Sequence, residues 1–324
     1  MGWRALGIAL LIALACELPT AFAQGRTRPV RIGGLTVSWG WTPGFVGLRE
    51  GLLELGYREG ADFVIGVRFT GGDIAGFEAA ARDLLTQGAD ILVAGEGDSA
   101  VAALAATTQV PIVMITGGDP VRRGLAHSYA RPGGNLTGIT DLDLELAAKR
   151  LEMFREIVPG LRRVLFAYDS ADRYSGAEAA AYRDGAHRLG LTLVERPIRG
   201  RGAAEALFAQ LQQGEVDGML GPNSLTSNIP GLVLEATSRL AIPSMFMGSF
   251  YVEQGGLANY GPNWHASGRQ AARLVDKIIK GIKPATIPIE VSSKIEFAIN
   301  LKTAKALGLV IPREVLYQAD RIIR

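Results

Sequence analysis

Apolar residues along this chain alternate between two spacings, which predicts alternating strands and helices. Short apolar runs over residues 30–38, 63–69, 91–94 and 111–116 fit buried strands. Between these runs, apolar residues recur at helical spacing, as Phe45, Leu48, Leu52 and Leu55 do, and again over residues 77–87 and 101–107. Alternation of this kind predicts a parallel sheet with helices on both faces.

The same alternation restarts after a turn-rich segment at residues 130–135, which predicts a second sheet and therefore a second lobe. A hinge is expected near Thr137–Asp141. Strands are expected at residues 164–168, 191–197, 216–221 and 242–247, with helices at 147–158, 177–189 and 203–213. A last helix near 271–278 and a last strand at 295–299 are too little for a third domain. We expect them to return to the lobes already built, so that the chain crosses between the lobes more than once.

The N-terminus has the pattern of a secretory signal peptide. Residues 5–16 are apolar but too short to span a bilayer, and Ala21–Ala23 forms an A-x-A cleavage site before Gln24. We therefore expect a signal peptide over residues 1–23; a lipoprotein anchored through Cys16 is less favoured, because Ala13 stands where such signals usually carry leucine. Cys16 is the only cysteine, so the mature chain has no disulfide and no thiolate. Export without disulfides indicates a bacterial periplasm.

Charge and motif content argue against several function classes. The chain has 34 Lys and Arg against 32 Asp and Glu, a net charge of +2, which does not suggest nucleic-acid binding. No other apolar run is long enough for a membrane helix. The histidines His127, His187 and His265 lack metal spacing, and no G-x-S-x-G elbow or Walker A loop is present. We therefore expect no enzyme activity, no metal and no cofactor.

The stretch "GEGDSA" at residues 95–100 has the outline of a dinucleotide fingerprint, and Asp119 lies near the distance of the expected acidic residue. However, the stretch follows about the third strand rather than the first. Glu96 and Asp98 would also repel a pyrophosphate there. A tight turn with Asp98 or Ser99 as the helix N-cap is the simpler interpretation. As a strand-end loop, it also offers polar groups to another ligand.

Loops that follow other expected strands supply further candidates, because ligands bind at the strand ends of open α/β sheets. Trp39 could stack on a flat ligand, the alternative being a core role. Asp119 could simply cap its turn, and Ser175 could cap a helix and hold an anion. Asn223 can both donate and accept hydrogen bonds. The candidate ligand-binding residues are Trp39, Gly97, Asp98, Ser99, Gly118, Asp119, Asp169, Ser175, Asn223 and Ser224.

Several segments together resemble the substrate-binding proteins of bacterial ABC transporters, in the family described as tryptophan/tyrosine transport-like. They are "GLLELGYREGADFVI", "ARPGGNLTGIT", "ELAAKRLEMFREIVPGLRRV", "GGLANYGPN" and "INLKTAKALGLVIPREVLYQAD". The resemblance implies the type I periplasmic binding protein fold: an α/β chain with two Rossmann-like lobes, parallel sheets, three connecting segments and a cleft between the lobes. It implies capture of a small solute and delivery to an inner-membrane ABC permease.

With that fold, we expect one lobe at residues 27–139 plus 262–288 and the other at 140–261 plus 289–324. We expect a monomer that captures a small polar or aromatic solute by hinge closure.

Relatives that resemble aromatic amino-acid binders carry a threonine-rich loop in place of Gly95–Ser99 and an Asp-Asn pair in place of Pro222–Ser224. The carboxylates present here instead indicate a cationic or hydroxyl-rich ligand. Two other functions stay open: a sensor module reporting to a membrane receptor, and a secreted enzyme using Glu96 and Asp98 as acid and base.

Overall fold

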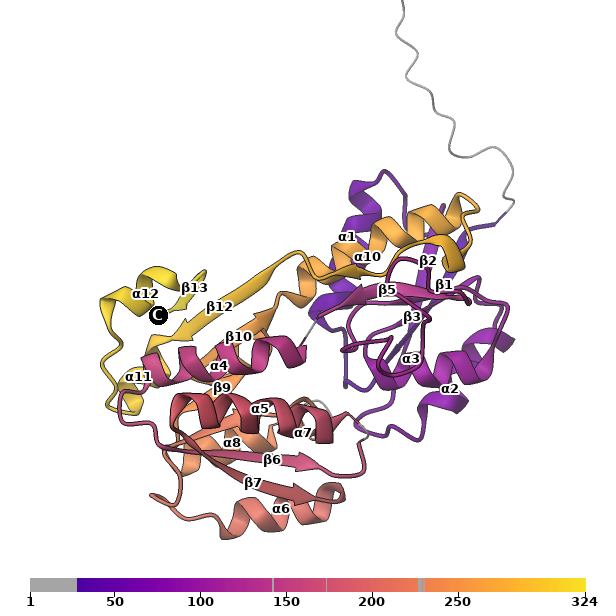
Figure 1. Cartoon of the computed structure of the whole chain (residues 1–324). Coiled ribbons are helices and arrows are strands. Elements are labelled where there is room, and N and C mark those ends of the chain that lie inside the picture. Colours follow the sequence, from indigo (N-terminus) through magenta and orange to yellow (C-terminus); the bar gives the residue numbers. More distant parts are fainter. Residues whose placement is uncertain (1–27, 142, 173, 227–228, 230) are drawn as a thin grey trace, which may run out of the picture.

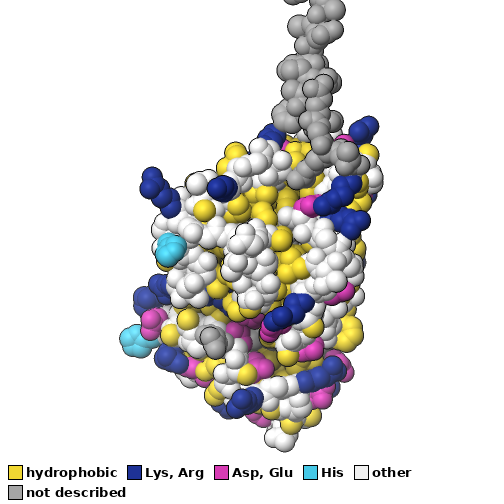
Figure 2. Space-filling view, turned by 90° about the vertical axis from the view of Figure 1, so that its right-hand side faces the viewer, with side chains coloured by type: hydrophobic (Ala, Val, Ile, Leu, Met, Phe, Trp, Pro, Cys, Tyr) yellow, Lys and Arg dark blue, Asp and Glu magenta, His cyan; other side chains and the backbone are white. Residues whose placement is uncertain are grey.

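The computed structural model describes residues 28–141, 143–172, 174–226, 229 and 231–324, and it places them in two lobes, each built on its own sheet (Figure 1). The expected signal peptide lies outside the described residues. Within them, no helix is both long and apolar enough to cross a bilayer. Basic and acidic side chains are intermixed over the face shown in Figure 2, in keeping with the balanced composition.

The first sheet has the strand order β11-β5-β4-β3-β1-β2, and every pairing in it is parallel. Its strands are β1 (Val30–Thr36), β2 (Phe63–Phe69), β3 (Ile91–Ala94), β4 (Ile112–Met114), β5 (Leu136–Thr140) and β11 (Glu290–Val291). Its helices are α1 (Pro43–Glu54), α2 (Phe77–Thr86), α3 (Gly97–Ala106), α10 (Trp264–Ile279) and the 3-10 turn η1 (Pro284–Thr286).

Helices α1 and α10 cover one face of this sheet, and α2 and α3 cover the other (Figure 1). Phe45, Leu48 and Leu52 of α1 are fully buried, as their spacing predicts. Leu55 is 44% exposed, because α1 has ended and Leu55 is its C-cap residue. The chain thus uses an element from near its C-terminus, α10, to complete the core of its N-terminal lobe.

The second sheet has the order β13-β12-β10-β9-β8-β6-β7. Its strands are β6 (Arg163–Asp169), β7 (Thr192–Ile198), β8 (Gly218–Gly221), β9 (Ser244–Phe246), β10 (Ala258–Pro262), β12 (Ile295–Asn300) and β13 (Arg321–Ile323). Helices α4 (Asp143–Ile157) and α5 (Ser175–Leu189) cover one face, with α6 (Gly200–Gln210) and α8 (Leu232–Arg239) on the other. The shorter helices are α7 (Asn223–Thr226), α9 (Ser249–Glu253), α11 (Leu301–Ala306) and α12 (Arg313–Gln318).

The described chain crosses between the sheets three times: from β5 to α4, from β10 to α10, and from β11 to β12. Strand β10 leads toward the first lobe and β12 returns from it, so these two strands are antiparallel in an otherwise parallel sheet. The expected boundary at residue 289 needs one correction. Glu290 and Val291 pair with β5 and extend the edge of the first sheet before the chain crosses back.

Candidate functional site

A cavity of about 360 Å³ lies between the lobes and is lined by residues of both. The first lobe contributes the loops that follow β1, β3 and β4, where strand-end contacts were expected. The second contributes residues around the start of α5 and on α8 and α9. The volume is in the range of small-molecule sites. Of the candidates named from sequence, those that line the cavity are Trp39, Gly97, Asp98 and Gly118.

Aromatic rings form much of the cavity wall. Trp39 and Trp41 are 64% and 45% exposed, so neither is a core plug. Elsewhere in the wall, Tyr251 of α9 meets Trp264 of α10 edge to face, with ring centroids 6.1 Å apart, and Phe250 lies beside Tyr251. Exposed ring faces at a cavity favour a ligand with a flat or apolar part. Sequence reasoning identified only the first of these five aromatic residues.

The turn between β3 and α3 is fixed by its own side chains. Glu96 is the N-cap residue, rather than Asp98 or Ser99. Its carboxylate accepts hydrogen bonds from Thr36 Oγ1 (2.5 Å) and the Val37 N–H (3.3 Å). Burial, with a smaller contribution from the charge of Asp98, raises the pKa of Glu96 to about 7. Ser99 is fully buried, its hydroxyl accepts from the Glu96 N–H (3.1 Å), and it does not line the cavity, so its side chain serves the turn.

Asp98 and Gly97 together hold an arginine against this turn. Asp98 Oδ1 accepts a hydrogen bond from Arg123 Nη2 at 2.5 Å. A Cβ at position 97 would overlap the Arg123 guanidinium, so glycine is needed for that approach. The guanidinium also lies 5.5 Å from the ring centroid of Tyr174, which belongs to the second lobe. Gly97 therefore makes room for Arg123, which sequence reasoning had not singled out.

Gly118 forms a second contact between the lobes. Its φ is +68°, and an added Cβ would lie 2.8 Å from both Cζ and Oη of Tyr174. Its N–H donates to Asp141 Oδ1 at 3.0 Å. Burial and the neighbouring Asp143 raise the pKa of Asp141 to about 7. Asp119 instead caps its own turn by accepting from two backbone N–H groups, which is why it does not line the cavity.

On the second lobe, Asp172 and Tyr174 reach the cavity and Ser175 does not. Ser175 begins α5, is fully buried, and donates its hydroxyl proton to Asp172 Oδ2 at 3.0 Å. Asp172 Oδ1 accepts from the Tyr174 N–H at 2.8 Å, and burial raises the pKa of Asp172. The Tyr174 hydroxyl is buried and has no hydrogen-bond partner within the described residues.

Two of the remaining candidates of the second lobe, Asp169 and Ser224, have structural roles. The Asp169 N–H donates to Ser224 Oγ at 3.2 Å, and Asp169 Oδ2 accepts from the Gly200 N–H at 3.3 Å. These bonds join β6 to α7 and α6, and neither Asp169 nor Ser224 lines the cavity. Asn223 begins α7, but its side chain lies outside the description.

A buried ion pair supports the cavity floor. Asp143, which lines the cavity, accepts from Arg150 Nη2 at 2.6 Å. Arg150 is fully buried and also donates to the Tyr260 carbonyl (2.7 Å) and the Tyr182 hydroxyl. Glu178 is buried nearby, and burial and the charge of Asp143 raise its pKa. The sequence did not predict this ion pair, because an Asp and an Arg seven residues apart on a helix rich in charged residues are usually exposed.

Among the described residues, no group of three His, Cys, Asp or Glu side chains could hold a metal.

Comparison with known proteins agrees with this architecture. The family model "ABC transporter substrate binding protein" matches residues 43–323. The "Tyrosine-binding protein" of Clostridioides difficile is 27% identical over 266 residues, which cover 81% of this chain and 76% of that protein. An ABC domain from Streptococcus pneumonia in complex with L-Trp is 25% identical with a TM-score of 0.79, covering 91% of this chain and 100% of that one. A conserved domain protein from Vibrio cholerae is 26% identical, with a TM-score of 0.80 and coverages of 92% and 100%. These matches confirm the resemblance found in the sequence, and the chain belongs to the ABC transporter substrate-binding protein family.

Proposed function

We propose that this protein is the solute-capturing component of an ABC importer, that it works in the periplasm, and that it closes its lobes around a small solute with an aromatic part. The observation that carries the proposal is the cavity of about 360 Å³ bordered by both lobes, with Trp39 at its wall. Relatives named for tyrosine binding or solved with L-Trp support an aromatic solute. The partner is an inner-membrane permease, which receives the solute from a monomeric binding protein.

Contacts that join the lobes support a mechanism of hinge closure. Tyr174 of the second lobe packs on Gly118 and under Arg123 of the first, so opening the lobes breaks both contacts. A solute held by residues of both lobes adds binding energy that only the closed state provides. The population therefore shifts by the difference in solute affinity between the two states.

A thermal-shift screen of amino acids, aromatic amines, polyamines and sugars tests the proposal. A ligand at a hundred times its Kd should add about 2.7 kcal/mol to the free energy of unfolding. Small-angle scattering should then show a smaller radius of gyration with the ligand bound. If no compound shifts unfolding and scattering shows no compaction, the proposal is wrong.

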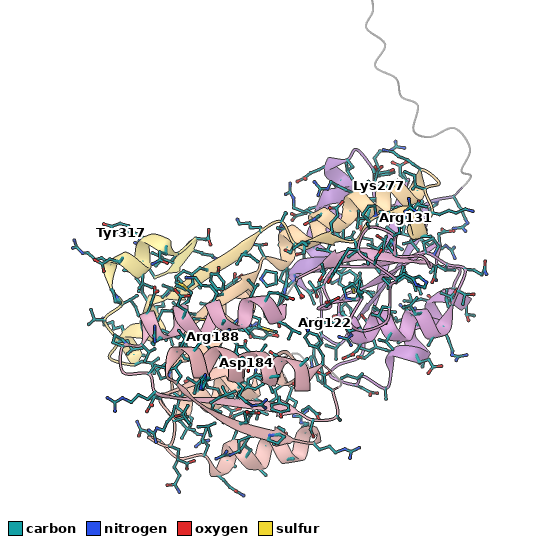
Figure 3. All side chains as sticks on the ribbon, in the orientation of Figure 1. Arg122, Arg131, Asp184, Arg188, Lys277 and Tyr317 are labelled. Carbon is teal, nitrogen blue, oxygen red and sulfur yellow. The ribbon has the colours of Figure 1, made fainter. Side chains whose placement is uncertain are left out.

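A pair of aromatic variants locates the ligand. Trp39→Ala should weaken binding about tenfold or more, because a stacked ring face is lost. Tyr317→Ala is the matched control: Tyr317 is 84% exposed on α12, at the end of the second lobe away from the first (Figure 3). Equal effects of the two substitutions would contradict a site between the lobes.

The compartment is tested separately. Fractionation of cells producing the full chain should recover the protein with the periplasm, and its mature N-terminus should be Gln24. Recovery in the cytoplasm with residues 1–23 intact would contradict the proposed location.

A further inference from the structure

The charges around the cavity are strongly one-sided. The described residues that line it include five carboxylates but only one cationic side chain, Arg123. The carboxylates belong to Glu96, Asp98, Asp141, Asp143 and Asp172. Residues of both lobes contribute to this set. Asp98 and Asp143 are paired with Arg123 and Arg150, so Glu96, Asp141 and Asp172 are the lining carboxylates without an ion-pair partner in the described part of the chain.

Arg123, the only cation among the described lining residues, already has partners. Arg123 pairs with Asp98, lies over the Tyr174 ring, and its side chain is only 15% exposed. Arg150, behind the wall, is fully buried and donates to three acceptors of the second lobe. A carboxylate on the solute would therefore have to break an existing ion pair to find a cationic partner.

Three of the carboxylates have only neutral hydrogen-bond donors in the described part of the chain. Glu96 accepts from a threonine hydroxyl and a backbone N–H. Asp141 accepts from the Gly118 N–H, and Asp172 from the Ser175 hydroxyl and a backbone N–H. Because none of these donors carries a positive charge, the three carboxylates can still stabilise a cation that enters the cavity, and the aromatic rings beside them attract cations through their faces.

We propose that the solute is an aromatic amine that carries a positive charge and no carboxylate. This inference rests on the proposed function and names the solute class for the same cavity. The amine lies among the carboxylates of Glu96, Asp141 and Asp172, and the ring lies against Trp39 and its aromatic neighbours. An aromatic amino acid shares the ring and the ammonium group but adds a carboxylate for which the described cavity has no free cation.

Proton release gives the inference a second, independent readout. Burial holds the pKa values of Glu96 and Asp141 at about 7, so each is partly protonated at neutral pH. A bound cation favours their charged forms and lowers these pKa values. Binding at pH 7 should therefore release protons, and the calorimetric heat should vary with the ionisation enthalpy of the buffer.

The test is isothermal titration of the full mature protein with three compounds that share an indole ring: tryptamine, L-tryptophan and indole-3-propionate. Tryptamine should bind about tenfold or more tightly than L-tryptophan, and indole-3-propionate should not bind. If L-tryptophan binds as tightly as tryptamine or more so, the inference is overturned while the solute-binding function stands. If none of these compounds binds and the wider panel also fails, both fall.

Charge-neutralising variants test the site. Asp172→Asn and Asp141→Asn each keep an oxygen acceptor for the local backbone N–H, and each should weaken tryptamine binding about tenfold. Asp184→Asn makes the same chemical change at an exposed position of α5 (Figure 3) and should have no effect. Equal affinities in all three variants would overturn the inference.

Arg173 is a basic residue between two cavity-lining residues, Asp172 and Tyr174, and it lies outside the described residues. The preference for tryptamine over L-tryptophan is therefore also measured in Arg173→Ala, where it should persist. Loss of that preference would equally overturn the inference.

Discussion

Replacing Arg150 by methionine should destabilise the protein more than removing Arg150 and Asp143 together. Arg150 is fully buried, and its guanidinium serves a carboxylate, a carbonyl and a hydroxyl. The single variant leaves Asp143, only 6% exposed, with a buried charge and no cation. Breaking a buried pair from one side costs about 3–5 kcal/mol, whereas an apolar pair of similar volume is often neutral.

In thermal unfolding this cost corresponds to a decrease in Tm of roughly 6–20 °C, at about 2–4 °C per kcal/mol for a lobe-sized unit. The comparison needs Arg150→Met, Asp143→Leu and the double variant, measured by calorimetry and by urea unfolding. Lys149→Met is the matched control: Lys149 precedes Arg150 on α4 and makes an exposed ion pair with Glu152, worth about 1 kcal/mol or less. The reasoning is refuted if Arg150→Met costs no more than Lys149→Met, or if the double variant costs as much as the two single variants added together.

Three further predictions concern the cavity and the first lobe. The pKa values of Glu96 and Asp141, about 7 in the folded protein, lie above unfolded values of about 4, so the folded state binds more protons. Stability from these groups should therefore fall by roughly 2–3 kcal/mol each as pH rises from 5 to 8, and unfolding of Glu96→Gln should show a flatter pH profile. Gly268→Ala should destabilise the first lobe by about 1–3 kcal/mol or more in urea unfolding, because its Cβ would overlap the Gly44 carbonyl; a silent substitution would contradict the α1–α10 packing. Tyr174→Phe should leave stability within about 0.5 kcal/mol in urea unfolding, since the hydroxyl has no partner within the described residues; a loss of more than about 1 kcal/mol would contradict this.

Most of the fold could be predicted because buried strands and amphipathic helices leave local patterns. The limits of β2 and β3 are those that the apolar runs predicted. The sequence analysis missed β10 and the helix α8, although the buried residues of α8, Val233, Ala236 and Thr237, recur at helical spacing. It also could not give the direction of β12, which depends on the lobe from which the chain returns and not on local sequence.

The sequence predicted a cavity-lining residue correctly only where its position after a strand was enough to place it at the cavity. Trp39 and Gly118 follow strands of the first sheet and do line the cavity. Ser99 and Ser175 also lie at such loops, but their hydroxyls are used by their own turns, a competition that residue type does not reveal. Tyr174 packs against Gly118 of the other lobe, and these two residues are too far apart in the sequence for a local pattern to reveal the contact.

In the function that we propose, the first crossing between the lobes takes part in both solute binding and lobe closure. Asp141 is held to the first lobe by the Gly118 N–H, and Asp143 is held to the second by Arg150. Both carboxylates line the cavity, so a cation bound there interacts with the chain on both sides of the crossing. When the lobes open, Asp141 would move with the first lobe and Asp143 with the second. The larger distance between them would weaken their combined attraction for the cation. If the solute is the cation that we propose, part of the affinity difference between the open and closed states would arise at this crossing.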